Sequence, residues 1–288
     1  MGSAPIAEGG LNVLEFTILI WLFSLLAGFL GALTGLGGGI VITPLLTLAF
    51  GVDIRYAIGA TLVSVIATSS GAAAAYVREG FSNIRIGMFL EIATTVGAIV
   101  GAFLAAKTPT AAIGVIFGIV LLYSAYVSSR PRHDRALDSR PDPLASRLKM
   151  DGSYPTPEGP TAYRVHAVPA GFGLMFVAGV MSGLLGIGSG AVKVIAMDQA
   201  MRLPFKVSTT TSNFMIGVTA AASAGVYLSR GYIDPGLAMP VMLGVLLGSL
   251  AGARLLARAQ TKLLRLVFGV VIAVLALEMI YHGLSGRL

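Results

Sequence analysis

The chain has 288 residues, of which 56% are hydrophobic and only 11% are charged, and its mean hydropathy is +0.85. An ordinary soluble domain is about 25% charged, so the composition excludes a soluble globular protein and indicates a polytopic helical membrane protein. The net charge of +7 does not indicate nucleic-acid binding, because Lys and Arg are spread over short loops and one linker without interleaved aromatic residues.

The N-terminal tail, 1–13, lacks the basic region of a secretory signal, so we expect the first apolar segment to stay in the mature protein. No cysteine is present, which excludes disulfides and thiolate metal sites. The three histidines lie in the linker or at the C-terminal end without metal-ligand spacing. We therefore expect neither a metal nor a cofactor.

Two sets of five apolar segments follow the tail. The first membrane repeat, 14–127, holds segments at about 14–33, 40–50, 56–77, 84–106 and 111–127. A charged linker occupies 128–167. The second membrane repeat, 168–282, holds segments at about 168–184, 191–201, 207–228, 235–257 and 262–282, and a C-terminal tail, 283–288, follows. This pattern predicts an all-α fold of about eight full spans and two half-helices.

The two repeats are related by a constant offset of 151 residues. Paired residues at that offset are Gly28/Gly179, Gly35/Gly186, Gly37/Gly188, Gly39/Gly190, Thr68/Thr219, Tyr76/Tyr227, Gly80/Gly231, Gly97/Gly248, Gly101/Gly252 and Gly118/Gly269. Membrane transporters are commonly built from two such halves, with the substrate held where the halves meet. We expect Gly97-x-x-x-Gly101 and Gly248-x-x-x-Gly252 to serve close helix packing.

A glycine cluster precedes the short second segment of each repeat, at 35–39 and at 186–190. The segment that follows, about 11 residues long, spans only about 16 Å as a helix, which is half a hydrocarbon core. A short helix after a glycine break at the same place in both halves predicts a pair of discontinuous helices that meet near the midplane.

The linker is expected to be polar and mobile, since it carries six prolines and little hydrophobicity. It also carries six arginines and Lys149, so the positive-inside rule places it in the cytoplasm. Five segments per repeat then predict inverted halves and periplasmic termini. Arg230 and Arg287 do not fit this topology, because it leaves both outside.

The glycine clusters suggest an anion site, because backbone N–H groups at a helix start suit an anion's oxygens. The alternative is that these glycines only allow close packing. Lys193 lies inside the second short segment. Burying a lysine within a membrane segment costs free energy, so Lys193 is a candidate for a functional role. The alternative is that it reaches the interface or pairs with Asp198. The glycine and lysine candidates for substrate binding are Gly37, Gly38, Gly39, Gly188, Ser189 in the same cluster, Gly190 and Lys193.

Hydroxyl and amide side chains complete the predicted site. The second repeat contributes Thr210, Ser212 and Asn213, and the first contributes Thr34, Thr61 and Ser64. The alternative for the hydroxyls is helix capping or bonding back to i−4 carbonyls. Two carboxylates within apolar segments, Glu91 and Glu278, are candidates for proton coupling, unless they reach the headgroups.

Three motifs resemble the sulfite exporter TauE/SafE family. They are Gly-x-x-x-Gly-Leu-Gly-Gly-Gly-x-x-x-x-Pro from Gly31 to Pro44, its echo from Gly183 to Gly190, and the Thr-Thr-Ser-Asn run four residues after Lys206. The resemblance covers nearly everything except the N-terminal tail and the linker. It implies an inner-membrane transporter of small sulfur-containing anions such as sulfite, sulfoacetate or other organosulfonates, without cofactor or nucleotide hydrolysis.

We therefore predict a secondary transporter that works by alternating access between inverted halves. Its expected partners are the anion and membrane lipid, with no nucleic acid. An anion channel of the same fold is the alternative, since the same donors can line a pore. A membrane-embedded enzyme is disfavoured because the segments hold no acid/base or metal constellation.

Overall fold

The computed structural model describes residues 12–34, 39–78, 81–129, 142–156, 159–188, 190–256 and 261–287. Helices in the first half are α1 (Val13–Thr34), α2 (Gly39–Phe50), α3 (Ile54–Arg78), α4 (Ile84–Lys107) and α5 (Thr110–Ser129). The linker contains α6 (Pro143–Arg147), β1 (Gly152–Thr156) and β2 (Gly159–Tyr163). The second half contains α7 (Val168–Leu185), α8 (Gly190–Ile195), the π-helical turn η1 (Ala196–Ala200), α9 (Phe205–Ser229), α10 (Pro235–Leu256) and α11 (Thr261–Leu284).

The ten predicted apolar segments are confirmed as helices to within two residues at each end, with α8 and η1 together forming the short segment of the second half. Four of the described helical stretches are long and apolar enough to cross a membrane: Val13–Leu30, Ile84–Lys107, Val168–Leu185 and Pro235–Gly252. The chain is therefore a multi-pass helical membrane protein. The count of eight spans remains a prediction.

Glycines bring the outer helices of the bundle into close contact. A methyl group added to Gly101 of α4 would lie 2.1 Å from Val180 O of α7, and one added to Gly248 of α10 would lie 2.0 Å from Leu25 O of α1. A methyl group added to Gly97 of α4 would lie 2.2 Å from Phe176 O of α7. The expectation that these glycines serve helix packing is confirmed, because no side chain fits between the backbones.

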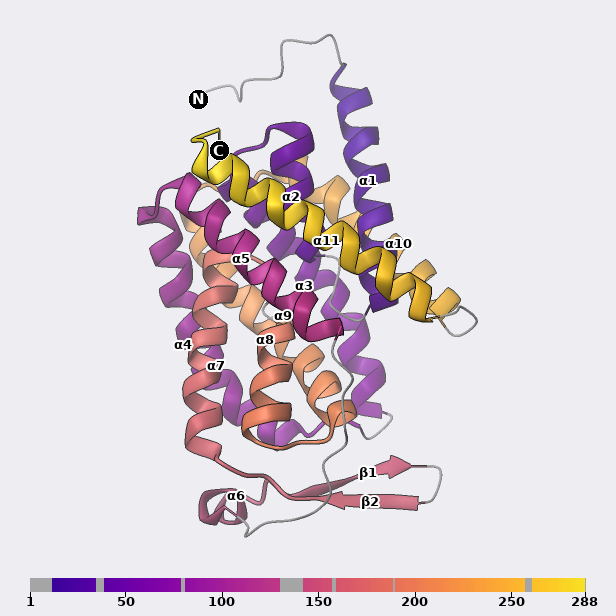
Figure 1. Cartoon of the computed structure of the whole chain (residues 1–288), viewed down its shortest axis with the longest axis vertical. Coiled ribbons are helices and arrows are strands. Elements are labelled where there is room, and N and C mark those ends of the chain that lie inside the picture. The colour runs from indigo at the N-terminus through magenta and orange to yellow at the C-terminus, as the bar shows by residue number, and fades with distance from the viewer. Residues whose placement is uncertain are drawn as a thin grey trace.

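α3 and α9 pack against each other in the interior and run in opposite directions (Figure 1). At one end of the bundle, the Arg55 guanidinium at the start of α3 lies 5.8 Å from the ring of Tyr232, which follows α9. At the other end, Lys206 at the start of α9 lies over the ring of Phe81, which follows α3. These contacts place the start of each helix beside the end of the other.

The linker differs from the mobile segment that its composition predicts, because its described part is folded. β1 and β2 form an antiparallel hairpin, which lies with α6 at one end of the bundle (Figure 1). Met150, Tyr163 and Val165 are buried against the starts of α4 and α7. Tyr163 contacts Tyr154 within the linker, but most buried residues of this cluster lie outside the linker, on the membrane helices and beside them. Burial against the bundle therefore stabilises the folded part of the linker.

Asn83 fastens the linker to the bundle. Its side-chain oxygen accepts from Ile86 N at 3.1 Å and so caps α4. Its Nδ2 donates to Met150 O at 2.9 Å and to the Tyr163 hydroxyl at 2.8 Å, while its backbone N–H donates to Thr211 Oγ1 of α9 at 3.1 Å. One residue thus joins the hairpin, α4 and α9.

Candidate functional site

Lys193, Thr219 and Glu91 form a polar cluster inside the bundle. Lys193 of α8 is completely buried, and its Nζ donates to Thr219 Oγ1 of α9 at 2.5 Å. The Thr219 hydroxyl lies 2.7 Å from Glu91 Oε1 of α4, to which it donates. The second carboxylate oxygen, Oε2, lies 3.9 Å from Lys193 Nζ. The cluster therefore joins a carboxylate of the first half to a lysine of the second half through one hydroxyl.

The Glu91 carboxylate is held unevenly. Oε1 accepts from Thr219 and also from Thr95 Oγ1 at 3.1 Å. Oε2 is buried and has no hydrogen-bond partner among the described residues. Because Glu91 is only 9% exposed, this oxygen lacks the solvation that a carboxylate normally requires. This oxygen, which accepts no hydrogen bond from the described residues, is the one that lies 3.9 Å from Lys193 Nζ.

This geometry bears on the alternatives for Lys193 and Glu91. Lys193 does not reach the surface, and Glu91 and Thr219 lie beside its ammonium group. Glu91 is buried rather than directed to headgroups. Removing one member of such a pair leaves an uncompensated buried charge, which is strongly destabilising.

Glu278 lies in a different setting. It is on α11, where its side chain is 52% exposed and its Oε2 lies 3.5 Å from His282 Nδ1 one turn away. An exposed i,i+4 pair contributes little to stability and does not face the interior of the bundle. Of the two carboxylates considered for proton coupling, the described structure brings only Glu91 next to Lys193.

The glycine starts of the two short helices lie close together. A methyl group added to Gly39 at the start of α2 would lie 2.7 Å from Val65 Cγ2 of α3 and 4.0 Å from the backbone O of Gly186, which caps the end of α7 where the second glycine cluster begins. Methyl groups added to Gly188 and Gly190 would lie 2.9 and 2.8 Å from side-chain atoms of Ile216 of α9. Branched apolar side chains of Val65 and Ile216 therefore lie against these glycines and cover them.

Val65 and Ile216 occupy equivalent positions in the two halves, since 216 − 65 = 151. Each comes from the central helix of its own half. Each half therefore uses the residue at the same repeat position to cover the glycines at the start of a short helix. The lysine cluster is not duplicated, because the residues equivalent to Lys193 and Glu91 are Ile42 and Met242.

Several predicted hydroxyls bond locally. Thr61 Oγ1 donates to Ala57 O at 2.8 Å, Ser64 Oγ to Ala60 O at 2.9 Å and Thr210 Oγ1 to Lys206 O at 2.9 Å. These are the i−4 bonds weighed as the alternative to substrate binding. Thr61 also shares a 2.8 Å hydrogen bond with Thr43 of α2, so it ties a short helix to its neighbour.

Ser212 and Asn213 behave differently. Ser212 Oγ donates to Gly190 O at 3.3 Å and so contacts the first turn of α8 directly. Asn213 is half-buried on the same helix. Gly37, Gly38 and Ser189 lie outside the described residues, and Thr34 ends α1 with a side chain that also lies outside them.

Thr219 and Thr95 are the polar residues that sequence reasoning did not assign to the site. Thr219 carried a signal, because it pairs with Thr68 at the repeat offset. Thr68 instead bonds back to its own helix, to Ser64 O at 3.0 Å and Val65 O at 3.3 Å. The described residues contain no group of three or more His, Asp or Glu side chains placed to hold a metal ion.

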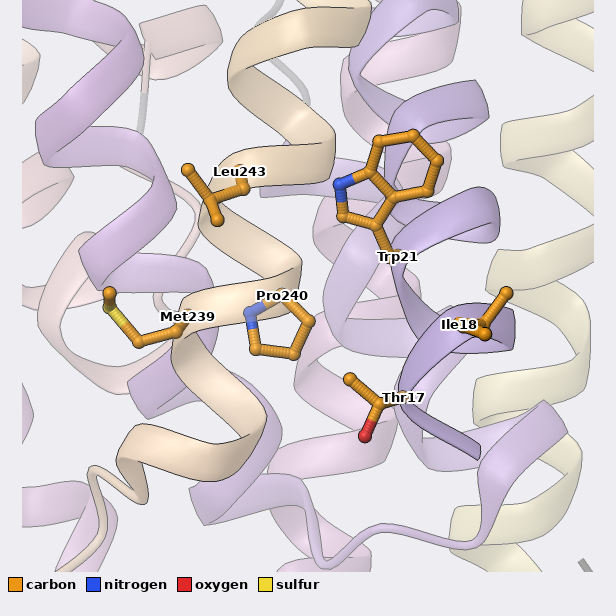
Figure 2. A pocket seen from close by; sticks show the side chains of 6 residues that line it. All are labelled: Thr17, Ile18, Trp21, Met239, Pro240 and Leu243. Atoms are coloured by element: carbon orange, nitrogen blue, oxygen red, sulfur yellow. The ribbon is translucent and has the colours of Figure 1, made fainter. Parts of the chain in front are cut away.

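A groove on the outside of the bundle, between α1 and α10, is separate from this cluster. Its volume is about 330 Å³, and it is lined by Thr17, Ile18, Trp21, Met239, Pro240 and Leu243 (Figure 2). The Thr17 hydroxyl already donates to Val13 O. With this apolar lining the groove offers no charge to an anion.

Comparisons with known proteins cover nearly the whole chain. A family model described as sulfite exporter TauE/SafE matches residues 20–279. YunE of Bacillus subtilis (strain 168), named a probable membrane transporter protein, is 27% identical over 278 residues, which cover 94% of this chain and 99% of that protein. YdhB of the same organism, with the same description, is 26% identical over 82% of this chain and 87% of its own length. No solved structure gives a significant match.

Proposed function

Because the chain belongs to the sulfite exporter TauE/SafE family, we propose that this membrane transporter carries small sulfur-containing anions by alternating access. The expected substrates are sulfite, sulfoacetate or other organosulfonates. The anion binds between the two halves, near the starts of α2 and α8. Lys193 supplies the positive charge, and polar groups of α9 supply directional hydrogen bonds.

The burial of Lys193 carries this proposal. A lysine inside a membrane segment costs about 2.5 kcal/mol or more, and residues that only maintain the fold rarely justify that cost. Lys193 lies in the fourth position of a short helix that begins at a glycine cluster, and free backbone N–H groups at a helix start also favour an anion. Both features favour an anion at the same place.

Three observations support inverted halves. The bounds of α3 and α9 differ by 151 at both ends, since 205 − 54 = 151 and 229 − 78 = 151. α3 and α9 run in opposite directions. The packing partners also exchange between halves, because α1 packs on α10 while its counterpart α7 packs on α4. In this proposal the halves rock about the α3–α9 contact, as in other transporters built from inverted repeats.

In this proposal the gate consists of Val65 and Ile216, the two side chains that cover the glycines. Val65 and Ile216 lie against the starts of α2 and α8, so the anion binds to the backbone N–H groups when these two side chains swing aside. Ser212 and Asn213 of α9 then face the bound anion. Closure of an apolar gate over an occupied site is what distinguishes a carrier from a continuously open pore.

The orientation in a bacterial inner membrane follows from charge. The linker hairpin lies at the opposite end of the bundle from the start of α1 and the end of α11 (Figure 1). Placing the Arg-rich linker in the cytoplasm puts both of those helix ends on the periplasmic side.

The proposed function is tested by a thermal-shift screen of the purified full-length protein. Sulfite, thiosulfate, sulfate, taurine and sulfoacetate are compared with carboxylate controls, because a ligand that binds the folded state raises its stability. We expect at least one sulfur anion to raise the Tm while the carboxylates do not. Equal shifts with all anions, or none with any, contradict the proposal.

A further inference from the structure

We propose that Glu91 is a proton site that competes with the transported anion for Lys193, so that one proton enters the protein with each anion. This inference rests on the proposed function and names its coupling ion. It makes the Lys193–Thr219–Glu91 cluster a coupling device as well as a binding site. Anion and proton then move in the same direction through the membrane.

The carboxylate has one oxygen prepared for a proton. Oε1 is occupied by hydrogen bonds from Thr219 and Thr95, whereas Oε2 has no hydrogen-bond partner among the described residues. Oε2 lies 3.9 Å from Lys193 Nζ, longer than the roughly 2.7–2.9 Å of a charge-assisted hydrogen bond. A proton can therefore bind Oε2 without first breaking a direct hydrogen bond to the lysine.

The charges determine the order of events. With Glu91 ionised, the cluster is neutral, and an approaching anion meets a carboxylate beside the ammonium group. With Glu91 protonated, Lys193 keeps its positive charge and has no negative neighbour in the cluster. The anion then becomes the counterion of Lys193. By reciprocity, a bound anion favours proton uptake by Glu91 to the same extent that the proton favours the anion.

Thr219 is a positioning residue between the two charges. Its hydroxyl has two acceptors for one hydrogen, Glu91 Oε1 at 2.7 Å and Met215 O at 3.0 Å on its own helix. When Glu91 is protonated, the hydroxyl can turn to Met215 O and still accept from Lys193. The hydroxyl therefore keeps the lysine in place in both states of the carboxylate, and it holds the two charges apart when both are present.

Lys193 is the charged side chain that faces Glu91 from the packed helices that the structure describes. α7 contains no titratable residue. On α9, Lys206 and Arg230 are 13 and 11 residues from Thr219, which is about 20 and 17 Å along the helix, and the Tyr227 hydroxyl donates to Gly183 O. Asp198 is the titratable group of η1. On α3, Arg55 and Tyr56 lie at the start of the helix, at the opposite end of the bundle from the linker hairpin. Tyr76 and Arg78 lie at its end, and their side chains are outside the described residues.

The inference is tested by counting protons during anion binding. Calorimetric titrations of the purified full-length protein with sulfoacetate and with thiosulfate are run in two buffers of different ionisation enthalpy. Neither probe changes its charge between about pH 6 and 8, because the carboxyl group of sulfoacetate titrates near pH 4 and its sulfonate, like thiosulfate, is the fully ionised anion of a strong acid. A proton taken up in that range therefore belongs to the protein. We expect uptake approaching about one proton per anion on the alkaline side, and an affinity that falls by up to about tenfold per pH unit.

Variants separate a coupling role from a structural one. Glu91→Gln should still bind the anion but take up no proton. Thr219→Val should move the pH dependence of affinity toward acid, because the two charges can then close into a direct ion pair. Thr68→Val is the matched control, since Thr68 is the repeat counterpart of Thr219 and bonds only to its own helix in the described structure. It should leave proton uptake unchanged.

The outcomes separate the two proposals. If the wild-type protein binds either anion without taking up a proton, or if Glu91→Gln takes up as many protons as the wild type, the coupling inference is overturned. A Thr219→Val protein with a lower Tm but the wild-type pH profile overturns the positioning role. Failure of the wild type to bind either anion counts against the proposed function instead.

Discussion

Lys193 Nζ and Glu91 Oε2 lie 3.9 Å apart in the interior of the bundle, although their residues are 193 − 91 = 102 positions apart and belong to different halves of the chain. Thr219 bridges them with one hydroxyl. In the proposed transport cycle, motion of one half against the other would stretch or break this contact. That motion would link substrate, proton and conformational change at one pair of residues.

Breaking this pair should reveal whether it serves stability or transport. Glu91→Leu leaves the lysine buried and unpaired, so we expect a loss of about 3–5 kcal/mol in the free energy of unfolding. The double variant Glu91→Leu/Lys193→Met should recover most of that loss, because two apolar side chains replace two charges. Thermal denaturation measures both effects. A double variant that also regains wild-type flux in vesicles would show that the pair is only structural.

Glycine contacts between the outer helices predict a second difference in stability. Gly183→Ala places a methyl group 2.0 Å from Ala98 O of α4, so α7 and α4 must separate and the Tm should fall. Gly173→Ala on the same helix meets nothing within 4 Å and should be neutral or stabilising by up to about 1 kcal/mol. Equal Tm values for the two variants would contradict the packing described for α4 and α7.

Asn83 should control the order of the linker hairpin. Asn83→Ala removes the cap of α4 and the side-chain bonds to Met150 O and the Tyr163 hydroxyl, which together contribute about 1–3 kcal/mol. We expect faster hydrogen–deuterium exchange in β1 and β2 with little change in α10. Tyr163→Phe, which removes only one of these bonds, should give a smaller effect. Unchanged exchange in the hairpin would show that Asn83 does not hold it.

The docking of α6 should weaken in acid. The Val168 N–H donates to Asp142 Oδ2 at 2.9 Å, and this bond, followed by that from Leu144 N–H, holds the pKa of Asp142 below its usual value of 3.8. A depressed folded-state pKa means that the stabilisation is present above the unfolded value and is lost as the pH falls through the folded one.

Hydrogen–deuterium exchange at Leu144 and Val168 checks this expectation. Protection should be retained at pH 5 and above and should decline below about pH 4, because the pKa of an aspartate in the unfolded chain is about 4. Asp142→Asn should show reduced protection already at neutral pH. Protection that stays constant through the acid range would contradict the role of the carboxylate.

Much of the fold was predictable from sequence for a physical reason. In lipid, each spanning segment must satisfy its own backbone hydrogen bonds, so apolar length and glycine breaks report directly on helices. This is why the bounds of α3 or α10 agree with the pattern to within two residues. A buried lysine is also visible in sequence, because the apolar context of Lys193 makes its charge conspicuous.

The partners of Lys193 and the linker hairpin were not predictable in this way. Glu91 and Thr219 reach Lys193 from α4 and α9, and no local spacing encodes that meeting. In the linker, Met150, Tyr163 and Val165 are too few to form a core of their own. They become buried only because the starts of α4 and α7 supply the other side of the cluster.

The most direct test of the account is anion flux through Lys193→Met in proteoliposomes. Uptake of labelled sulfite and sulfoacetate is compared with that of the wild type, with Thr68→Val as the control and detergent solubility and Tm confirming a folded protein. The account predicts saturable uptake in the wild type and in Thr68→Val, and none above background in Lys193→Met. Wild-type uptake of either anion by a folded Lys193→Met protein would contradict it.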